Sequence, residues 1–193
     1  MPMLTGSAPP ETRWPAPSGP ADLFSQDQLE SHAARIAGTH VVAADPWRGR
    51  PLLPRLDESA SRLDEAYTFL SAAARLDPQP SEDWLRDNHH VVQDQVRGVR
   101  LHLPGAYYRE LPKLADGPLQ GFPRVYLLAR ELTAHTAGRI DLDTVVDFVR
   151  AYQRTSVLSI GETWAVPIML RLALVEQLRL LADGVLAARQ NRD

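Results

Sequence analysis

Few side chains of this sequence have the types and the spacing that catalysis or metal binding needs. Asp87, His89 and His90 lie within four residues of one another, and Glu110 or Glu162 could join them in the fold. Imidazole and carboxylate groups serve both as acids or bases and as metal ligands. A metal site needs converging ligands, however, and histidines at helical spacing more often cap or pack. We therefore interpret Asp87, His89 and Glu162 as structural polar residues and predict no catalytic residue, metal or cofactor.

A second candidate site lies in the middle of the chain, where tyrosines and cations alternate. Aromatic faces stack on sugars and cations bind phosphate groups, so this pattern could form a saccharide or sugar-nucleotide platform. The favoured alternative is packing, with the hydroxyl groups bonded to the backbone. The predicted ligand- or partner-binding residues are Tyr107, Tyr108, Arg109, Lys113, Arg124 and Tyr126.

The stretch that carries these residues, from Leu103 to Tyr126, is rich in proline and glycine. Prolines fix φ and glycines permit positive φ, so the stretch encodes particular turns. Its large apolar side chains distinguish it from a flexible linker, because linkers of Gly and Ser have nothing to bury. We predict an ordered connector between two blocks of helix, with its prolines at Pro104, Pro112, Pro118 and Pro123.

The rest of the chain shows helical periodicity, and the sequence predicts an all-α bundle of about six helices. Predicted caps are Asp57, Ser81, Asp141 and a capping box of Ser159 with Glu162, and Gly38 is a predicted stop. In the last helix we expect a kink around Thr163 to Pro167 and an ion pair of Arg171 with Glu162 or another carboxylate. The predicted helices cover residues 22–37, 57–76, 81 to the connector, 124–136, 141–154 and 159–188.

Composition limits the class of protein further. A net charge of -3 gives no basic face, so nucleic acid is not an expected partner. The sequence has no cysteine and thus no disulfide or thiolate site, and it shows neither a signal peptide nor an apolar run that could cross a membrane. We predict a disordered Pro-rich tail over residues 1–21 and a single helical domain over 22–193.

Several strings together resemble one known family, the cyclic β-1,2-glucan synthases. The strings are RPLLPRLD (50–57), WLRDNH (84–89), YYRELPK (107–113), GFPRVY (121–126) and IGETWAVPIMLR (160–171). These synthases are large bacterial inner-membrane proteins of the glycosyltransferase 84 and glycoside hydrolase 94 type, and they make their product from UDP-glucose. The resemblance covers about Leu29 to Leu181 and is to their N-terminal cytoplasmic helical region.

The resemblance implies a part in β-1,2-glucan synthesis, but it brings no catalytic residue, because the membrane spans and catalytic domains of the family have no counterpart here. We expect a non-catalytic helical module whose partners are the catalytic domains of a glucan synthase or a related synthase. The resemblance also implies a cytoplasmic location. A partner or further domains would hold the module at the inner face of the inner membrane. The alternative is a small glycan or sugar-nucleotide binding module that uses the Tyr107 to Tyr126 surface. A hydrolase or lyase built on Asp87, His89 and Glu110 is the weakest hypothesis.

Overall fold

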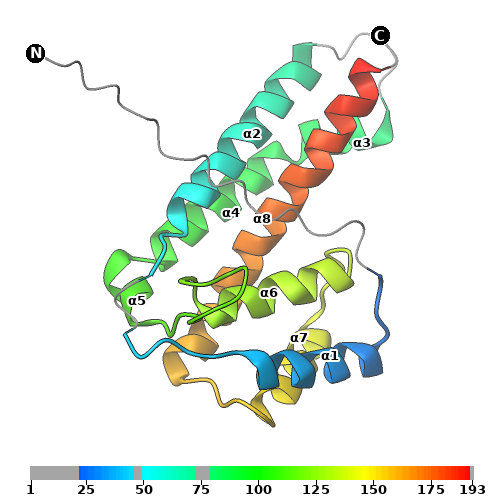
Figure 1. The fold of residues 1–193 in the computed structure, drawn as a ribbon. Coiled ribbons are helices and arrows are strands. Elements are labelled where there is room, and N and C mark those ends of the chain that lie inside the picture. The colour runs from blue at the N-terminus through cyan, green and yellow to red at the C-terminus, as the bar shows by residue number, and fades with distance from the viewer. Residues whose placement is uncertain (1–21, 46–48, 73–78, 192–193) are drawn as a thin grey trace, which may run out of the picture.

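The structure is a computed structural model that describes residues 22–45, 49–72 and 79–191. Within these ranges the chain is all-α, as predicted, and contains two isolated β-bridges but no strand. The predicted tail over residues 1–21 lies outside the described residues, as does the predicted end of the second helix at Leu76. The helices are α1 (Gln26–Thr39), α2 (Leu53–Ala72), α3 (Pro80–Asp87), α4 (His89–His102), α5 (Gly105–Glu110), α6 (Arg124–His135), α7 (Leu142–Gln153) and α8 (Ile160–Gln190) (Figure 1).

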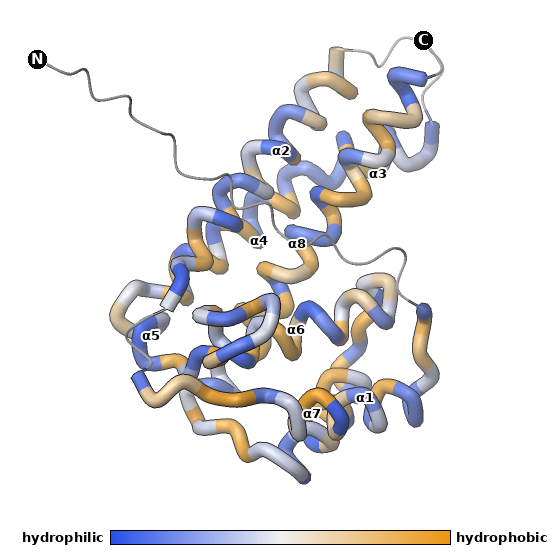
Figure 2. The backbone as a smooth tube through the Cα atoms, viewed as in Figure 1, coloured by the Kyte–Doolittle hydropathy of each residue, from blue (hydrophilic) through white to orange (hydrophobic). Residues whose placement is uncertain are grey.

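The longest helix, α8, contacts both halves of the molecule. Helices α2, α3 and α4 pack along it at one end of the molecule, and α6 packs against it at the other, beside the paired helices α1 and α7 (Figure 1). Apolar residues recur along the whole of α8 (Figure 2). This distribution suits a helix that packs against neighbours on several sides, although one face of its first turns stays exposed.

Buried side chains from all of these helices except α3 and α5 form one connected hydrophobic core. Its largest members are aromatic and come from α6, α7 and the connector: Phe122, Tyr126, Phe148 and Tyr152, each exposed by 2% or less. Rings of this size bury the most apolar surface per residue, so they contribute much of the stabilisation of the fold.

Several helix ends differ from the prediction. The first helix starts at a capping box of Ser25 and Gln28 and continues through Gly38 to Thr39, so Gly38 is not a stop. The second starts at Leu53, which places Asp57 inside the helix, where it pairs with Arg100. At Asp57 a tertiary contact with Arg100 replaces the predicted capping role, and such contacts override local preferences.

The predicted third helix is divided in two. Its first part begins at Pro80 after Gln79, so Ser81 lies inside the helix and is not the cap. At Asn88 the backbone leaves helical geometry, and α4 starts at the next residue. This break and the short α5 account for the two helices that the described part of the chain has beyond the predicted six.

Two predicted N-terminal helix caps are confirmed. The side chain of Asp141 accepts from the backbone N–H of Thr144, and Ser159 and Glu162 form the capping box of α8. Helix α8 continues through Pro167, which has no N–H for the helical ladder. The kink that we predict there stays a prediction.

The connector is ordered, as its apolar content predicts. It begins with α5, and then an antiparallel bridge joins Lys113 to Pro123 while a second joins Leu114 to Val42. Gly117 and Gly121 have positive φ values of 77° and 82°, which close the turn between the bridged segments. The apolar side chains that hold the connector to the core are Leu111, Leu114, Leu119 and Phe122.

Candidate functional site

Tyr107 and Tyr108, two of the predicted binding residues, bond their hydroxyl groups to the backbone of the protein. The hydroxyl of Tyr107 donates to the carbonyl of Gly161 at 2.6 Å, and that of Tyr108 donates to the carbonyl of Arg50. Burial raises the pKa of the Tyr108 hydroxyl. Two of the three predicted tyrosines are thus committed to backbone oxygens, which is the packing role that the sequence favoured.

Lys113 is almost completely buried, with 1% of its surface exposed. Its ammonium group lies over the ring of Tyr108 and donates to the backbone carbonyls of Tyr108 and Arg109. Burial lowers the pKa of this ammonium to about 8, because the charged form loses its hydration. A cation in this position holds the end of α5 and has no open side for a phosphate group.

Arg124, also predicted as a binding residue, makes a buried ion pair with Glu162. Its Nε lies 2.5 Å from Oε1 and its Nη2 lies 2.8 Å from Oε2, so both carboxylate oxygens accept from one guanidinium. Glu162 is fully buried, and its hydrogen bond to Arg124 raises the pKa of the guanidinium. Paired, bidentate geometry is what makes two buried charges tolerable.

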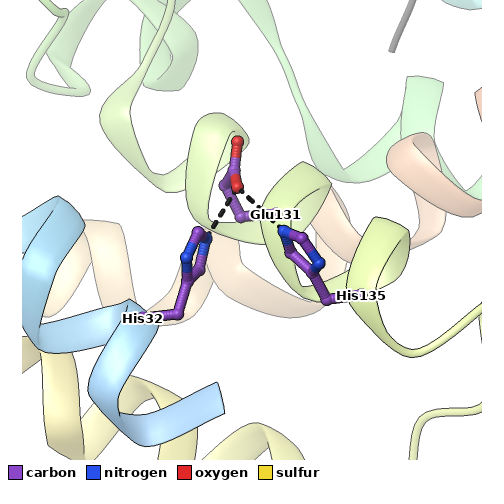
Figure 3. A group of neighbouring side chains, drawn as sticks. All are labelled: His32, Glu131 and His135. Atoms are coloured by element: carbon purple, nitrogen blue, oxygen red, sulfur yellow. Dashed lines mark hydrogen bonds and ion pairs between the residues drawn. The ribbon is translucent and has the colours of Figure 1, made fainter. Parts of the chain in front are cut away.

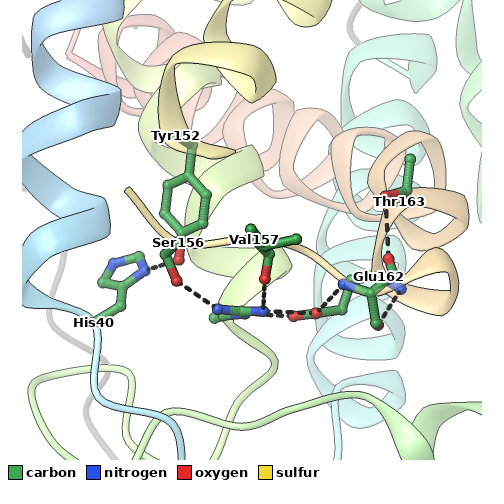
Figure 4. A network of polar contacts seen from close by, with 8 residues as sticks. His40, Tyr152, Ser156, Val157, Glu162 and Thr163 are labelled. Atoms are coloured by element: carbon green, nitrogen blue, oxygen red, sulfur yellow. Dashed lines mark hydrogen bonds and ion pairs between the residues drawn. The ribbon is translucent and has the colours of Figure 1, made fainter. Parts of the chain in front are cut away.

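The remaining donors of Arg124 hold the segment that leads into α8. They bond to the Ser156 hydroxyl and to the carbonyl of Val157, each at 2.8 Å (Figure 4). Glu162 also accepts from the backbone N–H of Ser159, which closes the capping box. One arginine on α6 thereby fixes the α7–α8 loop and the first turn of α8.

Tyr126 belongs to a second buried polar group. Its hydroxyl donates to Glu176 on α8 at 2.6 Å, and Arg55 on α2 pairs with the same carboxylate at 2.8 Å. Burial, followed by the nearby Glu176, raises the pKa of Tyr126. This group links α6, α8 and α2, so Tyr126 has a structural contact rather than an accessible ring. Of the six predicted binding residues, Arg109 is exposed and the other five are half-buried or buried.

Asp87, His89 and Glu162, the candidate acid/base residues, do not form one cluster in the structure. Its ring stacks on Tyr67 and its Nε2 lies 2.8 Å from Asp64. Asp87 is exposed and lies 3.8 Å from Arg86, whereas Glu162 is buried with Arg124. The structural roles expected for His89 and Glu162 therefore have identified contacts.

The predicted pair of Arg171 and Glu162 is wrong. Glu162 pairs with Arg124, and Arg171 is exposed on the outer face of α8. Residues at i, i+4, i+7 and i+11 share one helix face, and this face is exposed at every such position from Ile160 to Arg171. The charge of Arg171 thus needs no buried partner, because water solvates it.

On the N-terminal side of Arg171, the same face of α8 is apolar. Ile160 is 75% exposed and Trp164 is 72% exposed, and Val157 in the preceding loop is 76% exposed. We call these three residues the α8 entry surface. Ile160 and Trp164 are neighbours on one helix face, and adjacent exposed apolar groups of this size can serve as a contact surface. Two buried-side hydrogen bonds hold the backbone of this surface in place. Arg124 donates to the carbonyl of Val157, and Tyr107 donates to the carbonyl of Gly161.

Sequence reasoning missed two features. One is the α8 entry surface, because helical periodicity does not show which face of a helix stays uncovered. The cluster of His32, Glu131 and His135 was missed because its members are up to 103 residues apart, although Glu131 and His135 stand at helical i, i+4 spacing. That spacing is the signal that could have pointed to the pair.

Comparison with known proteins confirms the resemblance. The chain is 33% identical over 172 residues to the cyclic beta-(1,2)-glucan synthase NdvB of Rhizobium meliloti (strain 1021). The alignment covers 88% of this chain and 6% of NdvB, so the chain spans a small part of the length of that relative. No protein-family model matches the chain. No helix among the described residues is long and apolar enough to cross a membrane.

Proposed function

We propose that the chain is a non-catalytic helical module that supports cyclic β-1,2-glucan synthesis through contacts with the catalytic portion of a glucan synthase. The observation that carries this proposal is the similarity to NdvB along 88% of the chain. The polar groups singled out in the sequence add support, because those of Tyr107, Tyr108, Lys113, Arg124 and Tyr126 are bonded within the protein. Groups engaged in this way hold the scaffold together.

The α8 entry surface is the contact region that the proposal assigns. Its occupant is the part of an NdvB-type synthase that lies outside the matched region, which is most of that protein. Tryptophan buries a large apolar area on binding and is enriched among residues that dominate interface energies. Ile160 and Trp164 stand one turn apart on α8, so one apolar partner surface can cover both.

Binding between the purified chain and a synthase tests this role. The partner is detergent-solubilised NdvB from which the matched 172 residues are deleted, and biolayer interferometry measures the dissociation constant. Trp164→Ser and Ile160→Ser should each weaken binding about tenfold or more, because each removes an apolar anchor. The matched control is Leu142→Ser on α7, since Leu142 is 75% exposed but lies outside the α8 entry surface.

Two results would contradict the proposal. One is an affinity that Trp164→Ser and Leu142→Ser change equally, which would remove the α8 entry surface as the contact. The other is transfer of glucose from UDP-glucose by the purified chain alone, lost on mutation within it, which would make the module catalytic.

Fewer observations support the alternative function, a glycan or sugar-nucleotide binding module on the Tyr107 to Tyr126 surface. A sugar platform needs open aromatic faces and free donors, whereas Tyr126 has no exposed surface and Lys113 has 1%. Calorimetry with β-1,2-glucan and with UDP-glucose separates the two functions. Heat of binding that Tyr107→Ala abolishes would favour the glycan module, and the absence of heat at millimolar ligand would reject it.

A further inference from the structure

Three side chains from two helices converge between α1 and α6. His32 comes from α1, and Glu131 and His135 come from successive turns of α6 (Figure 3). Both imidazoles point to the same carboxylate oxygen: His32 Nε2 lies 2.7 Å from Glu131 Oε2, and His135 Nε2 lies 3.6 Å from it. Among the described residues, these three are the group of histidines and acids whose ligand atoms lie within 4.8 Å of one another.

The hydrogen bonds of His135 leave a lone pair directed at the carboxylate. Its Nδ1 lies 2.9 Å from the carbonyl of Asp22, and because a carbonyl oxygen only accepts, Nδ1 carries the proton. When the ring is neutral, Nε2 is therefore the nitrogen with the free lone pair, and it faces the Glu131 oxygen across 3.6 Å. A metal ion placed between them would be coordinated by this nitrogen and by the carboxylate oxygen. A backbone carbonyl on the far ring nitrogen is also the usual way in which a metal-binding histidine is oriented.

We propose that His32, Glu131 and His135 bind a divalent transition-metal ion of the Zn²⁺ class, with solvent in the fourth position. Two imidazoles and a carboxylate suit Zn²⁺ better than Mg²⁺ or Ca²⁺, which prefer oxygen ligands. Ligands about 2.0–2.1 Å from a tetrahedral zinc ion stand about 3.3 Å apart. The separation of 3.6 Å between His135 and Glu131 already fits this value, and that of 2.7 Å between His32 and Glu131 must widen.

The surroundings allow the ion to enter and the ligands to adjust. The side chains of Glu131 and His135 are 30% and 16% exposed, so solvent reaches the cluster from one side. The ring of Phe24 stacks on His135 at 3.8 Å and makes an edge contact with His32, so the apolar side of the cluster is closed. Three protein ligands and one open position are the arrangement of zinc sites that keep an exchangeable water.

Arg35 disfavours metal binding, because it holds His32 in the tautomer that cannot coordinate an ion through Nε2. Its Nη2 lies 2.5 Å from His32 Nδ1, which must then accept, so His32 Nε2 carries a proton and donates to Glu131. Metal binding requires the other tautomer, with Nδ1 protonated and Arg35 turned away. Arg35 is exposed, so it can move into solvent. The carboxylate of an Arg35→Glu variant would instead accept from Nδ1–H and hold the ligating tautomer.

Metal binding by the full, untagged chain tests the site after treatment with chelator. Calorimetry with ZnCl₂ at pH 7.5 should show one ion bound per chain with a micromolar or lower dissociation constant, and Co²⁺ should give the visible absorption of a tetrahedral site. His135→Gln and Glu131→Gln should each weaken binding by about 10- to 100-fold. Binding should also weaken at pH 5.5, because protonated imidazole is not a ligand.

The controls separate coordination from a structural role. His102→Gln should leave binding unchanged, because His102 is on α4 and its Nδ1 bonds to the carbonyl of Gly98. Arg35→Glu should tighten binding about tenfold, and a merely structural cluster would not respond in this direction. No uptake below about 100 µM Zn²⁺, or uptake that Glu131→Gln and His135→Gln leave unchanged, would overturn the proposal. Circular dichroism of each variant verifies that the helices are intact.

Discussion

Arg124 is the residue on which the entry into α8 depends. It uses one guanidinium to neutralise Glu162 and to hold Ser156 and the carbonyl of Val157. The planar fork of arginine matches two carboxylate oxygens at once, which lysine cannot do. The residue that the sequence offered as a phosphate ligand is therefore the one that keeps the α8 entry surface in place.

Arg124→Gln should lower the free energy of unfolding by about 3–5 kcal/mol, because Glu162 would remain buried without its counter-charge. Urea denaturation followed by circular dichroism measures the change. Arg171→Gln is the matched control, since Arg171 is exposed and its loss should change stability by less than about 0.5 kcal/mol. Equal effects of the two substitutions would show that the buried pair contributes nothing beyond an exposed charge.

At the scale of elements, the connector shows how turns can be fixed without regular strands. Ala43 and Ala115 donate to carbonyls across the segments that the bridges join, and Arg50 donates to the carbonyl of Gly121. Gly121 has φ of 82°, and a Cβ built there would lie 3.0 Å from Cγ of Arg50. Both the backbone angle and the neighbour thus require glycine at this turn.

Gly121→Ala should destabilise the fold by about 1–3 kcal/mol, through the left-handed backbone and the contact with Arg50. Gly98→Ala is its counterpart in α4, where a Cβ would meet nothing within 4 Å. That substitution should stabilise the fold by about 0.5–1 kcal/mol, because alanine favours a helix more than glycine does. Urea midpoints of the two variants should move in opposite directions, and a shift in the same direction would refute the assigned backbone role of Gly121.

For the whole molecule, α8 is the element that joins the two ends. Near the start of α8, Glu162 pairs with Arg124 of α6. In the middle of the helix, Glu176 contacts Tyr126 and Arg55. Near its end, Arg189 pairs with Glu82 of α3 at 2.6 Å. The last pair is also buried, with both side chains at most 4% exposed. Ion pairs at successive levels of one helix fix its rotation relative to its neighbours.

Arg189→Gln should release α3 from the end of α8, because the buried Glu82 would then seek solvent. Amide hydrogen exchange should speed up at least tenfold in α3 and stay unchanged in α6. Arg179→Gln is the control, since the pair of Arg179 and Asp183 is partly exposed and lies within α8. Unchanged protection of α3 in Arg189→Gln would show that its apolar contacts suffice.

The sequence alone determined the helical class, the helix caps at Asp141 and Ser159, the order of the connector and the resemblance to glucan synthases. These properties depend on residues close together in the chain, so their patterns can be read locally. Partners could not be read in this way. Arg124 meets Glu162 across 38 residues, and His32 meets Glu131 across 99, because packing of α6 against α8 and α1 brings them together. Which face of α8 stays uncovered is decided by the same packing, so only the tertiary structure distinguishes the buried Glu162 from the exposed Trp164 two residues later.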